Sequence, residues 1–563
     1  MDLRVLSGPQ LSAAAKAYLE ALSRVSYHGP RVDIQWENLS HSVQVPLKNT
    51  GITNVLESAT RFASGGPFNQ VPKKELNVLK GMNGEVKAGT CTLVLGNSGG
   101  GKTTFLRALS GRLEGYTGRV LWNGVAPSSL AAPHKLATLA PQEDTHEALL
   151  TVTESLEFAA SCTLADLPSG ASSAELSLRK DLVSHVIDTL GLRECALVAL
   201  GDGQTRGVSG GQAKRVTLGE ALVTGSRLLL LDEITNGLDS AIAEEVCAFL
   251  SAWAHVTGGT VVCALQAPTP EILASFDKVL LLSDGRQLYH GPPSQLAGYL
   301  ESQGFPCPTT YDIADFSLLV CLSPAYAAQV LGLPVKATQA SLADAWTASH
   351  PPSPPPTSSP TGVLLREGSA DIGQFGVPQV HGFFRVLGLL LSRQFKLVKR
   401  NPAVSFGRVI QFLILGALFG SIYYKLKVDD FVTKISMAIF AASAVSFAAF
   451  AEIPAIFLGK RVACRHLEGG FYGPGAYVTS VMLNSLPVSI ISTFLFATIM
   501  YFMCGFAEDA GRYFFFVLSL VAHELSTAAL FRFLAFVAPT EELANAAAGI
   551  TTGSLLIFGG FYM

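Results

Sequence analysis

The stretch LVLGNSGGGKTTFLRAL (Leu93–Leu109) passes from an apolar run through a glycine-rich turn into a helical pattern. We expect a buried strand, a tight loop and a helix in that order. The loop, GNSGGGKT (Gly96–Thr103), fits the spacing G-x-x-x-x-G-K-[ST]. Glycines let backbone N–H groups curl around an anion, and the N-terminal end of the next helix carries partial positive charge. The stretch therefore predicts a phosphate-binding loop.

Two side chains of this loop have specific expected roles. Lys102 is spaced to pair with the β- and γ-phosphates of a nucleotide, and the Thr103 hydroxyl is spaced to bind Mg²⁺. The candidate phosphate-binding residues are Gly96, Asn97, Ser98, Gly99, Gly100, Gly101, Lys102, Thr103 and Thr104.

A second motif, RLLLLDEITNGLDS (Arg227–Ser240), supplies the complementary carboxylates. Its four leucines predict a buried strand that delivers Asp232 to its end, where the carboxylate can hold Mg²⁺ through water. Glu233 can then polarise an attacking water as a general base. Taken alone, the Asp-Glu pair would equally suit the start of a helix. The phosphate-binding loop upstream favours the catalytic interpretation.

The composition of the chain changes along its length. Of the 563 residues, 49% are hydrophobic and only 15% are charged, and the long apolar runs lie in the last 160. Five apolar segments approach the ~20 residues that cross a bilayer as a helix. They are residues 404–424, 433–457, 476–504, 513–538 and 543–563. Buried helices of a large soluble domain are the alternative, but five such segments are hard to hide in a water-soluble fold.

These patterns divide the chain into four parts. We expect an N-terminal extension over residues 1–70, an α/β nucleotide-binding domain with a helical subdomain over 71–322, a Pro/Ser-rich linker over 323–380 and an all-α membrane domain over 381–563. RVDIQWENLSHSVQVPL (Arg31–Leu47) alternates like an edge strand or hairpin. FFRVLGLLLSRQFKLVKRNP (Phe383–Pro402) predicts an amphipathic helix at the membrane surface.

The net charge and the cysteine spacing argue against several classes of function. The net charge of −3 gives no basic excess for nucleic acid, and no pair of cysteines has C-x-x-C spacing for zinc or redox chemistry. Basic residues cluster before the first expected span and between the second and third, so both loops and the α/β domain are predicted to be cytoplasmic. These basic residues are Lys396, Lys399, Arg400, Lys460, Arg461 and Arg465.

Between the two phosphate motifs lies GVSGGQAKRVTLGEAL (Gly207–Leu222), which resembles a known family. Ser209, Gly210, Gly211 and Gln212 match the signature motif of ATP-binding-cassette ATPases. The resemblance implies that ATP and Mg²⁺ are bound, and that the signature motif contacts nucleotide held by a second ATPase domain.

Four further positions can be compared with the family pattern. Gln142 resembles the family's Q-loop residue, which contacts Mg²⁺ and water and senses the membrane domain, and Asp239 resembles the D-loop residue. Asn236 stands where serine or threonine is common. Gln266 occupies the place of the switch histidine that contacts the γ-phosphate, and a glutamine cannot carry its positive charge. Hydrolysis at this site is therefore left open, whereas ATP binding is not.

The order of ATPase first and membrane domain second resembles subfamily G, in particular the N-terminal half of pleiotropic-drug-resistance transporters. Gly459–Ser480 and Ala528–Met563 carry the resemblance in the membrane part. Family membrane domains have six helices, so we expect this chain, which ends at the fifth, to be a truncated gene model or half of a split protein. The resemblance implies a second ABC half as partner, an amphipathic or lipid-like small molecule as substrate, and a multi-pass protein of the plasma membrane.

Two functions remain open from the sequence. The first is an ATP-driven exporter, and the second is a weakly or non-hydrolysing regulatory or scaffold half, which Gln266 and the missing sixth helix motivate. A soluble cassette ATPase of translation would need a second cassette and no membrane spans. Intramembrane polar residues could touch substrate or pair with neighbouring helices. These candidates are Arg408, Asn484, His523, Glu524 and Arg532.

Overall fold

The computed structural model describes the following parts of the chain: residues 11–25, 31–46, 73–130, 133–164, 172–203, 205–330, 332, 338–349, 381–426 and 431–557. The chain forms two compact units. The N-terminal unit consists of Met1–Asp144, Val152–Val198 and Val208–Val380. The C-terminal unit consists of Thr145–Thr151, Ala199–Gly207 and His381–Met563. Each unit is described by itself.

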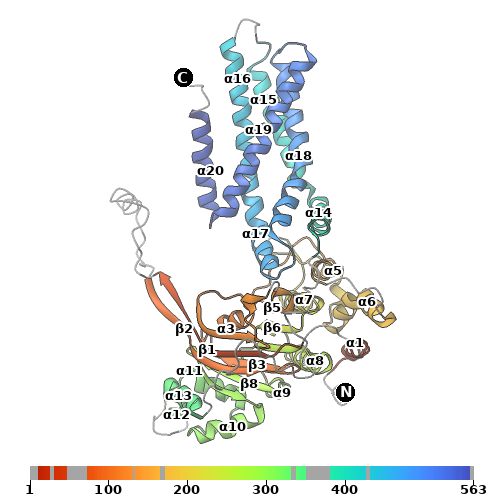
Figure 1. The fold of residues 1–563 in the computed structure, drawn as a ribbon. Coiled ribbons are helices and arrows are strands. Elements are labelled where there is room, and N and C mark those ends of the chain that lie inside the picture. Colours follow the sequence, from red (N-terminus) through yellow and green to blue (C-terminus); the bar gives the residue numbers. More distant parts are fainter. Residues whose placement is uncertain are drawn as a thin grey trace. The chain divides into compact units, whose positions relative to one another are not determined.

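A six-stranded sheet forms the centre of the N-terminal unit (Figure 1). Its strand order is β5-β6-β7-β3-β8-β9, with β9 antiparallel to β8 and the other neighbours parallel. The strands are β3 (Cys91–Gly96), β5 (Ala137–Ala140), β6 (Leu228–Asp232), β7 (Thr260–Ala264), β8 (Lys278–Ser283) and β9 (Arg286–Gly291). Every residue of β3, β6 and β7 is buried, as expected for central parallel strands that are covered on both faces. Because these three strands are neighbours, the predicted motifs that follow β3 and β6 emerge at one edge of the sheet.

A second, three-stranded antiparallel sheet has the order β2-β1-β4. Its strands are β1 (Ile34–Pro46), β2 (Lys73–Val86) and β4 (Tyr116–Trp122). An edge strand or hairpin was expected at Arg31–Leu47, and β1 does pair antiparallel with β2, the next strand in the chain. However, β4 pairs with the other side of β1, so β1 is the middle strand and not an edge strand. Trp36 of β1 packs edge-to-face on Phe105 at 5.2 Å between ring centroids, and both belong to the main apolar core.

Helices surround the two sheets of the N-terminal unit. They are α1 (Ala13–Ser23), α3 (Lys102–Leu109), α4 (Pro133–Leu136), α5 (Val152–Thr163), α6 (Ser173–Thr189), α7 (Gly210–Val223), α8 (Ser240–Thr257), α9 (Pro270–Ala274), α10 (Pro293–Ser302), α11 (Ile313–Leu322), α12 (Pro324–Val330) and α13 (Gln339–Ser349). Short 3₁₀ turns lie at Pro127–Ser129 and Arg193–Cys195.

The expected linker at 323–380 differs from the structure over its first part. Residues 324–330 and 339–349 form α12 and α13, and α13 packs on β9. Trp346 explains this, because its ring lies 5.2 Å from that of Tyr289 and 5.3 Å from that of Tyr299. One buried aromatic side chain thus holds α13 to the sheet. The proline-rich stretch at 350–362 lies outside the described residues.

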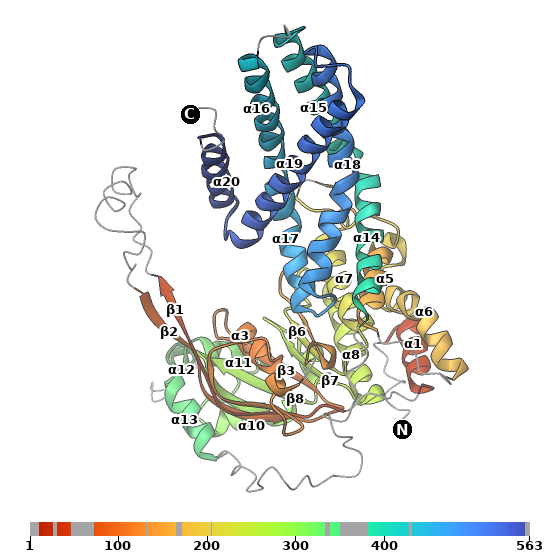
Figure 2. The ribbon, with the colours of Figure 1, turned by 45° about the horizontal axis from the view of Figure 1, so that its top comes forward.

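The C-terminal unit is helical. Its helices are α14 (Phe383–Arg400), α15 (Pro402–Ile422), α16 (Phe431–Ala448), α17 (Glu452–Glu468), α18 (Pro474–Met503), α19 (Ala510–Val537) and α20 (Glu541–Leu556). A 3₁₀ turn, η4 (Ala449–Ala451), joins α16 to α17. Figure 2 shows α15, α16, α18 and α19 running alongside one another. α18 contains Pro487 in its interior.

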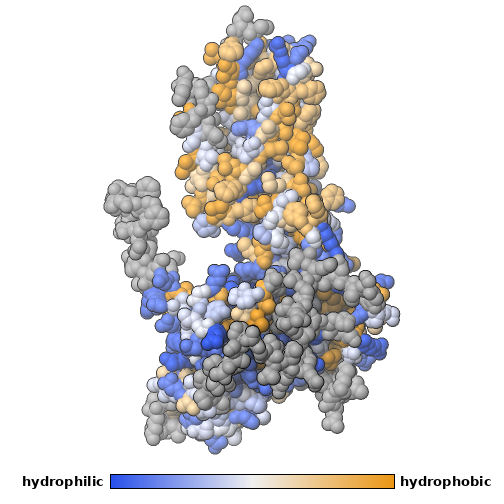
Figure 3. Space-filling view, in the orientation of Figure 1, coloured by the Kyte–Doolittle hydropathy of each residue, from blue (hydrophilic) through white to orange (hydrophobic). Residues whose placement is uncertain are grey.

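Four helical segments within the described residues are long and apolar enough to cross a membrane: Pro402–Ile422, Phe431–Glu468, Pro474–Met503 and Ala510–Val537. Their outer surface is apolar (Figure 3), with exposed side chains such as Phe406, Ile414, Phe515 and Phe533. The fifth expected span begins with α20, which has 16 residues, and residues 558–563 lie outside the described part. The segment expected to connect the second and third spans is helical as far as Glu468, because α17 runs on through Lys460, Arg461 and Arg465.

Candidate functional site

The phosphate-binding loop connects β3 to α3 and is shaped by its glycines. Gly99 and Gly101 have φ values of 76° and 100°, which favour glycine over every residue with a Cβ. A Cβ on Gly96 would lie 2.1 Å from the backbone oxygen of Leu282, so this position also has no room for a side chain. α3 begins at Lys102, directly after the loop. The backbone N–H groups of this loop and helix start can therefore surround an anion.

Lys102 is nearly buried, with 5% of its surface exposed. Its Nζ donates to Gly96 O at 2.7 Å and lies 3.9 Å from Glu233 Oε1. Burial lowers the pKa of Lys102, and the nearby Glu233 and Asp232 carboxylates oppose that effect. The ammonium is thus held at the turn where phosphate oxygens would bind.

Asp232 lies at the end of β6 with only 2% of its surface exposed. Burial raises the pKa of Asp232, and a hydrogen bond from Thr103 opposes the rise. Its Oδ1 is buried and accepts no hydrogen bond from the described residues. An unpaired buried carboxylate oxygen is costly, and carboxylate and hydroxyl oxygens are the ligands that Mg²⁺ prefers. Asp232 and Thr103 therefore fit a Mg²⁺ ion.

Glu233 follows Asp232 with a positive φ of 50°, and its N–H donates to Ala264 O of β7 at 2.8 Å. Three side-chain amides converge on its carboxylate. Gln142 Nε2 and Asn236 Nδ2 each donate to Oε2 at 2.7 Å, and Gln266 Nε2 lies 2.9 Å from both oxygens. The structure therefore brings Gln142, Glu233 and Gln266 together, as a shared site requires. The convergence of Asn236 on Glu233 was not foreseen from the sequence.

The signature residues lie at the start of α7. Ser209 caps this helix: its Oγ accepts from Gln212 N at 3.3 Å, while Gln212 Oε1 accepts from Ser209 N at 2.9 Å. A Cβ on Gly211 would lie 2.7 Å from Gly237 O, so the motif packs closely against the loop that leads to Asp239. Asp239 itself is the N-terminal flanking residue of α8. The motif thus presents a capped helix start, the feature expected of a phosphate contact.

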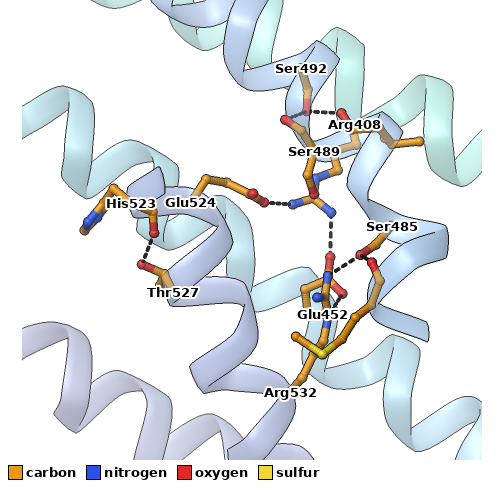
Figure 4. Close-up of polar contacts among 11 residues, drawn as sticks. Arg408, Glu452, Ser485, Ser489, Ser492, His523, Glu524, Thr527 and Arg532 are labelled. Carbon is orange, nitrogen blue, oxygen red and sulfur yellow. Dashed lines mark hydrogen bonds and ion pairs between the residues drawn. The ribbon is translucent and has the colours of Figure 1, made fainter. Parts of the chain in front are cut away.

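A second polar cluster lies inside the C-terminal unit (Figure 4). Arg408 of α15 donates to Glu452 Oε1 at 2.6 Å and to Glu524 Oε1 at 2.5 Å. Arg532 Nε donates to Glu452 Oε2 at 2.8 Å, and its Nη2 donates to Ser485 Oγ at 2.6 Å. These four charges sum to zero and join α15, α17 and α19, and the bond from Arg532 to Ser485 adds α18. We call Arg408, Glu452, Glu524 and Arg532 the membrane charge cluster.

The five intramembrane polar residues expected from the sequence lie in different surroundings. Arg408, Glu524 and Arg532 belong to the membrane charge cluster, and His523 Nε2 lies 2.7 Å from Ser446 Oγ of α16. Asn484 is the neighbour of Ser485 on α18. Glu452, which bridges the two arginines, lies inside the expected span 433–457 but was not singled out there.

Residues 145–151 belong to the C-terminal unit and contact both α14 and α17. Arg393 Nη2 of α14 lies 3.8 Å from Glu147 Oε1, and Arg400 Nη1 donates to Leu149 O at 2.6 Å. Arg465 Nη1 of α17 donates to Thr145 O at 2.5 Å. Burial raises the pKa of Glu147, and Arg393 opposes the rise. We call residues 145–151 the docking segment, and it starts three residues after Gln142.

Comparison with known proteins agrees with this architecture. Residues 79–236 match the family model of the ABC transporter, and residues 385–563 match that of the ABC-2 type transporter. ABC transporter G family member 34 of Oryza sativa subsp. japonica is 29% identical, with 97% of this chain and 40% of that protein covered. Pleiotropic drug resistance protein TUR2 of Spirodela polyrhiza is 27% identical, with 96% of this chain and 40% of that protein covered.

The N-terminal part of the chain is similar to ABC transporters, and the C-terminal part is similar to ABC-2 type transporters. The relatives of the chain are G-family members and include a pleiotropic-drug-resistance protein, which confirms the resemblance seen in the sequence. The α/β cassette followed by a helical membrane domain confirms the expected fold class. The chain spans about 40% of the length of the curated relatives it matches.

Proposed function

We propose that this chain binds ATP with Mg²⁺ at the phosphate-binding loop and uses hydrolysis to export amphipathic or lipid-like small molecules across a membrane. The observation that carries the proposal is the convergence of Lys102, Asp232 and Glu233 at one sheet edge, with Asp232 Oδ1 buried and unpaired among the described residues. We place the protein in the plasma membrane, with the cassette on the cytoplasmic side, by its basic loops and its resemblance to subfamily G.

Hydrolysis in this arrangement divides the work among named side chains. Water attacks the γ-phosphorus, the bond to the β–γ bridging oxygen breaks, and Glu233 accepts the proton of the water. Lys102 and the loop N–H groups hold the phosphate oxygens. Asp232, Thr103 and Gln142 are the proposed ligands, direct or through water, of Mg²⁺, which supplies positive charge against the phosphate oxygens. Gln266 donates a hydrogen bond where a histidine would carry charge.

A second ABC half completes the proposed machine. Ser209, Gly210, Gly211 and Gln212 would contact nucleotide held by that half, which is another copy, a different chain or a C-terminal continuation. ATP binds better to the closed pair than to the open pair and so shifts the population towards closure. The docking segment starts three residues after Gln142 and contacts α14 and α17, which makes it the proposed route from nucleotide to membrane helices.

One observation favours a second candidate function. The Glu233 carboxylate accepts from three amides, and each must be rearranged or tolerated when a water binds there. Together with Gln266, this supports a weakly or non-hydrolysing regulatory half that binds ATP without turning it over.

Replacing Glu233 by glutamine separates the two functions. In the exporter, Glu233→Gln should keep ATP affinity and lower turnover by about 100-fold or more, because a general base contributes about 10²–10⁴. Phosphate release by purified protein in lipid nanodiscs is the measurement, with exposed Glu301→Gln of α10 as the matched control. A wild-type rate no higher than that of Glu233→Gln would contradict the exporter and support the regulatory half.

A further inference from the structure

A buried lysine connects the signature helix to the Q-loop. Lys214 lies in the second turn of α7, and only 4% of its surface is exposed. Its Nζ donates to Gln142 O at 2.5 Å and lies 3.2 Å from Asp144 Oδ1. A buried ammonium needs such partners, because an unpaired charge in the interior is strongly unfavourable. The proposed nucleotide contacts of this chain do not include Lys214.

The two acceptors of Lys214 lie on either side of Glu143 in the Q-loop. Thr217, one turn further along α7, donates to Asp144 Oδ1 at 2.6 Å. The backbone at Gln142 is therefore tied to α7 by a charge-assisted hydrogen bond, and the backbone at Asp144 is tied through its side chain. Both ties come from one face of the helix, since residues three apart are neighbours on a helix surface.

The Gln142 side chain extends from this tied backbone to the catalytic carboxylate. Its Nε2 donates to Glu233 Oε2 at 2.7 Å. A continuous chain of contacts thus runs from the start of α7 through Lys214 and Gln142 to Glu233. The start of α7 is the signature motif, which would face the nucleotide of the other half.

We propose that Lys214 is a positioning residue that sets Gln142 against Glu233 and Mg²⁺ according to the position of the signature helix. When α7 meets nucleotide on the partner half, Lys214 carries its displacement to the Gln142 of its own site. Each chain would then couple the nucleotide held by the partner half to the nucleotide held at its own site. This inference rests on the proposed function, because it assumes that Gln142 contacts Mg²⁺ or water.

The competing explanation is that Lys214 only neutralises the buried Asp144 carboxylate. The two explanations differ in what a charge-balanced double variant does. Lys214→Met with Asp144→Asn removes both charges, so a purely neutralising role predicts recovery. A positioning role predicts no recovery, since the donor to Gln142 O is still missing.

The test uses the full chain in lipid nanodiscs and has two readouts. In nucleotide-free protein, hydrogen exchange of the peptide covering residues 137–144 should be faster in Lys214→Met than in wild type. In titrations with a fluorescent ATP analogue, Lys214→Met should need about tenfold more Mg²⁺ for half-maximal binding, since one lost contact of about 1.4 kcal/mol corresponds to tenfold. The double variant should behave like Lys214→Met, and ATP-analogue affinity without Mg²⁺ should be unchanged.

Matched variants make the outcome decisive. Thr217→Val removes the other tie to Asp144 but leaves Gln142 O its donor, so its Mg²⁺ requirement should be that of wild type. In a Gln142→Ala background, Lys214→Met should add no further shift, because both act through one contact. If Lys214→Met does not fold, Lys214→Arg keeps the charge beside Asp144 but replaces the single ammonium by a wider fork, and it should still raise the requirement.

Three results would overturn the inference: an unchanged Mg²⁺ requirement in a folded Lys214 variant, recovery in the double variant, or a shift that persists without the Gln142 side chain. These differ from failure of the proposed function. That failure appears as equal turnover in wild type and Glu233→Gln, or as loss of ATP-analogue binding in the wild type itself.

Discussion

The nucleotide site and the membrane charge cluster both bury charges, but they stabilise them differently. In the nucleotide site, Asp232 and Glu233 are carried by the end of one strand, and Asp232 Oδ1 accepts no hydrogen bond from the described residues. In the membrane charge cluster, Arg408 and Glu452 each contact two opposite charges, which come from different helices. In the second arrangement every charge has an opposite charge within 2.8 Å, although Arg408 Nε and Glu524 Oε2 are also buried there without a hydrogen-bond partner among the described residues.

This difference predicts where a substitution acts. Removing a side chain from the nucleotide site deprives a ligand of a partner and should leave folding largely intact. Removing one from the membrane charge cluster leaves the opposite charge buried in an apolar surround, which is costly for the fold itself. Stability and nucleotide affinity are therefore the two measurements that separate the regions.

The largest expected effect is in the membrane charge cluster. Arg532→Leu leaves Glu452 with one cation in place of two and should lower the free energy of unfolding by about 3–5 kcal/mol, the usual cost of breaking a buried pair. Thermal unfolding in detergent is the measurement. Arg512→Leu on the same helix α19 is the control, because Arg512 is exposed.

A charge-balanced variant sharpens this result. Arg532→Leu with Glu452→Gln leaves Arg408 paired with Glu524, so it should recover part of the lost stability. The comparison between the two regions fails if Arg532→Leu is no less stable than Arg512→Leu.

The next effect concerns the nucleotide site. Lys102→Ala should weaken binding of an ATP analogue by about 10- to 100-fold, which corresponds to about 1.4–2.8 kcal/mol, because the phosphates lose a charged donor. Its unfolding temperature should stay near that of wild type. Equilibrium fluorescence titration gives the affinity, with exposed Lys87→Ala as the control. Unchanged affinity together with a large loss of stability would mean that Lys102 stabilises the fold and does not bind nucleotide.

The smallest expected effect concerns a partly exposed ion pair in the cassette. His255 Nε2 lies 3.1 Å from Asp277 Oδ1, and the hydrogen bond with Asp277 raises the pKa of His255. The charged histidine therefore stabilises the fold below its unfolded pKa, and this contribution is lost as pH rises through its folded pKa. His255→Gln should cost a few tenths of a kcal/mol near pH 5.5 and about nothing near pH 8.5. A loss that is equal at both pH values would exclude the ion pair as its cause.

The sequence predicted the cassette well because its chemistry lies in contiguous motifs. Gly96–Thr103, Asp232 and Glu233 follow strands whose apolar runs are easy to identify, and parallel neighbours must deliver their ends to one edge. Gln142 and Gln266 were reached only through the family resemblance. Lys214 was missed, since a lysine inside a helix gives no signal in the sequence that it is buried.

The membrane charge cluster shows what sequence could not supply. Arg408, Glu524 and Arg532 were recognisable as intramembrane polar residues. Glu452, the shared partner of the two arginines, lies 44 residues from Arg408 and 80 from Arg532 in the chain. No motif encodes that pairing, because helix rotation and packing decide which faces meet. The helices at 324–330 and 339–349 were missed for a related reason, as the tertiary contact of Trp346 holds the latter in place.

Pro487 interrupts the hydrogen bonding of α18 close to Ser485, a residue of this helix that contacts the membrane charge cluster. A proline has no N–H, so the carbonyl of Leu483 loses its usual intrahelical donor, and the helix there resists bending less than its neighbours do. Ser485, which accepts from Arg532, lies two residues before the proline, and Ser489 lies two after it. A bend of α18 at Pro487 would therefore move the acceptor of Arg532.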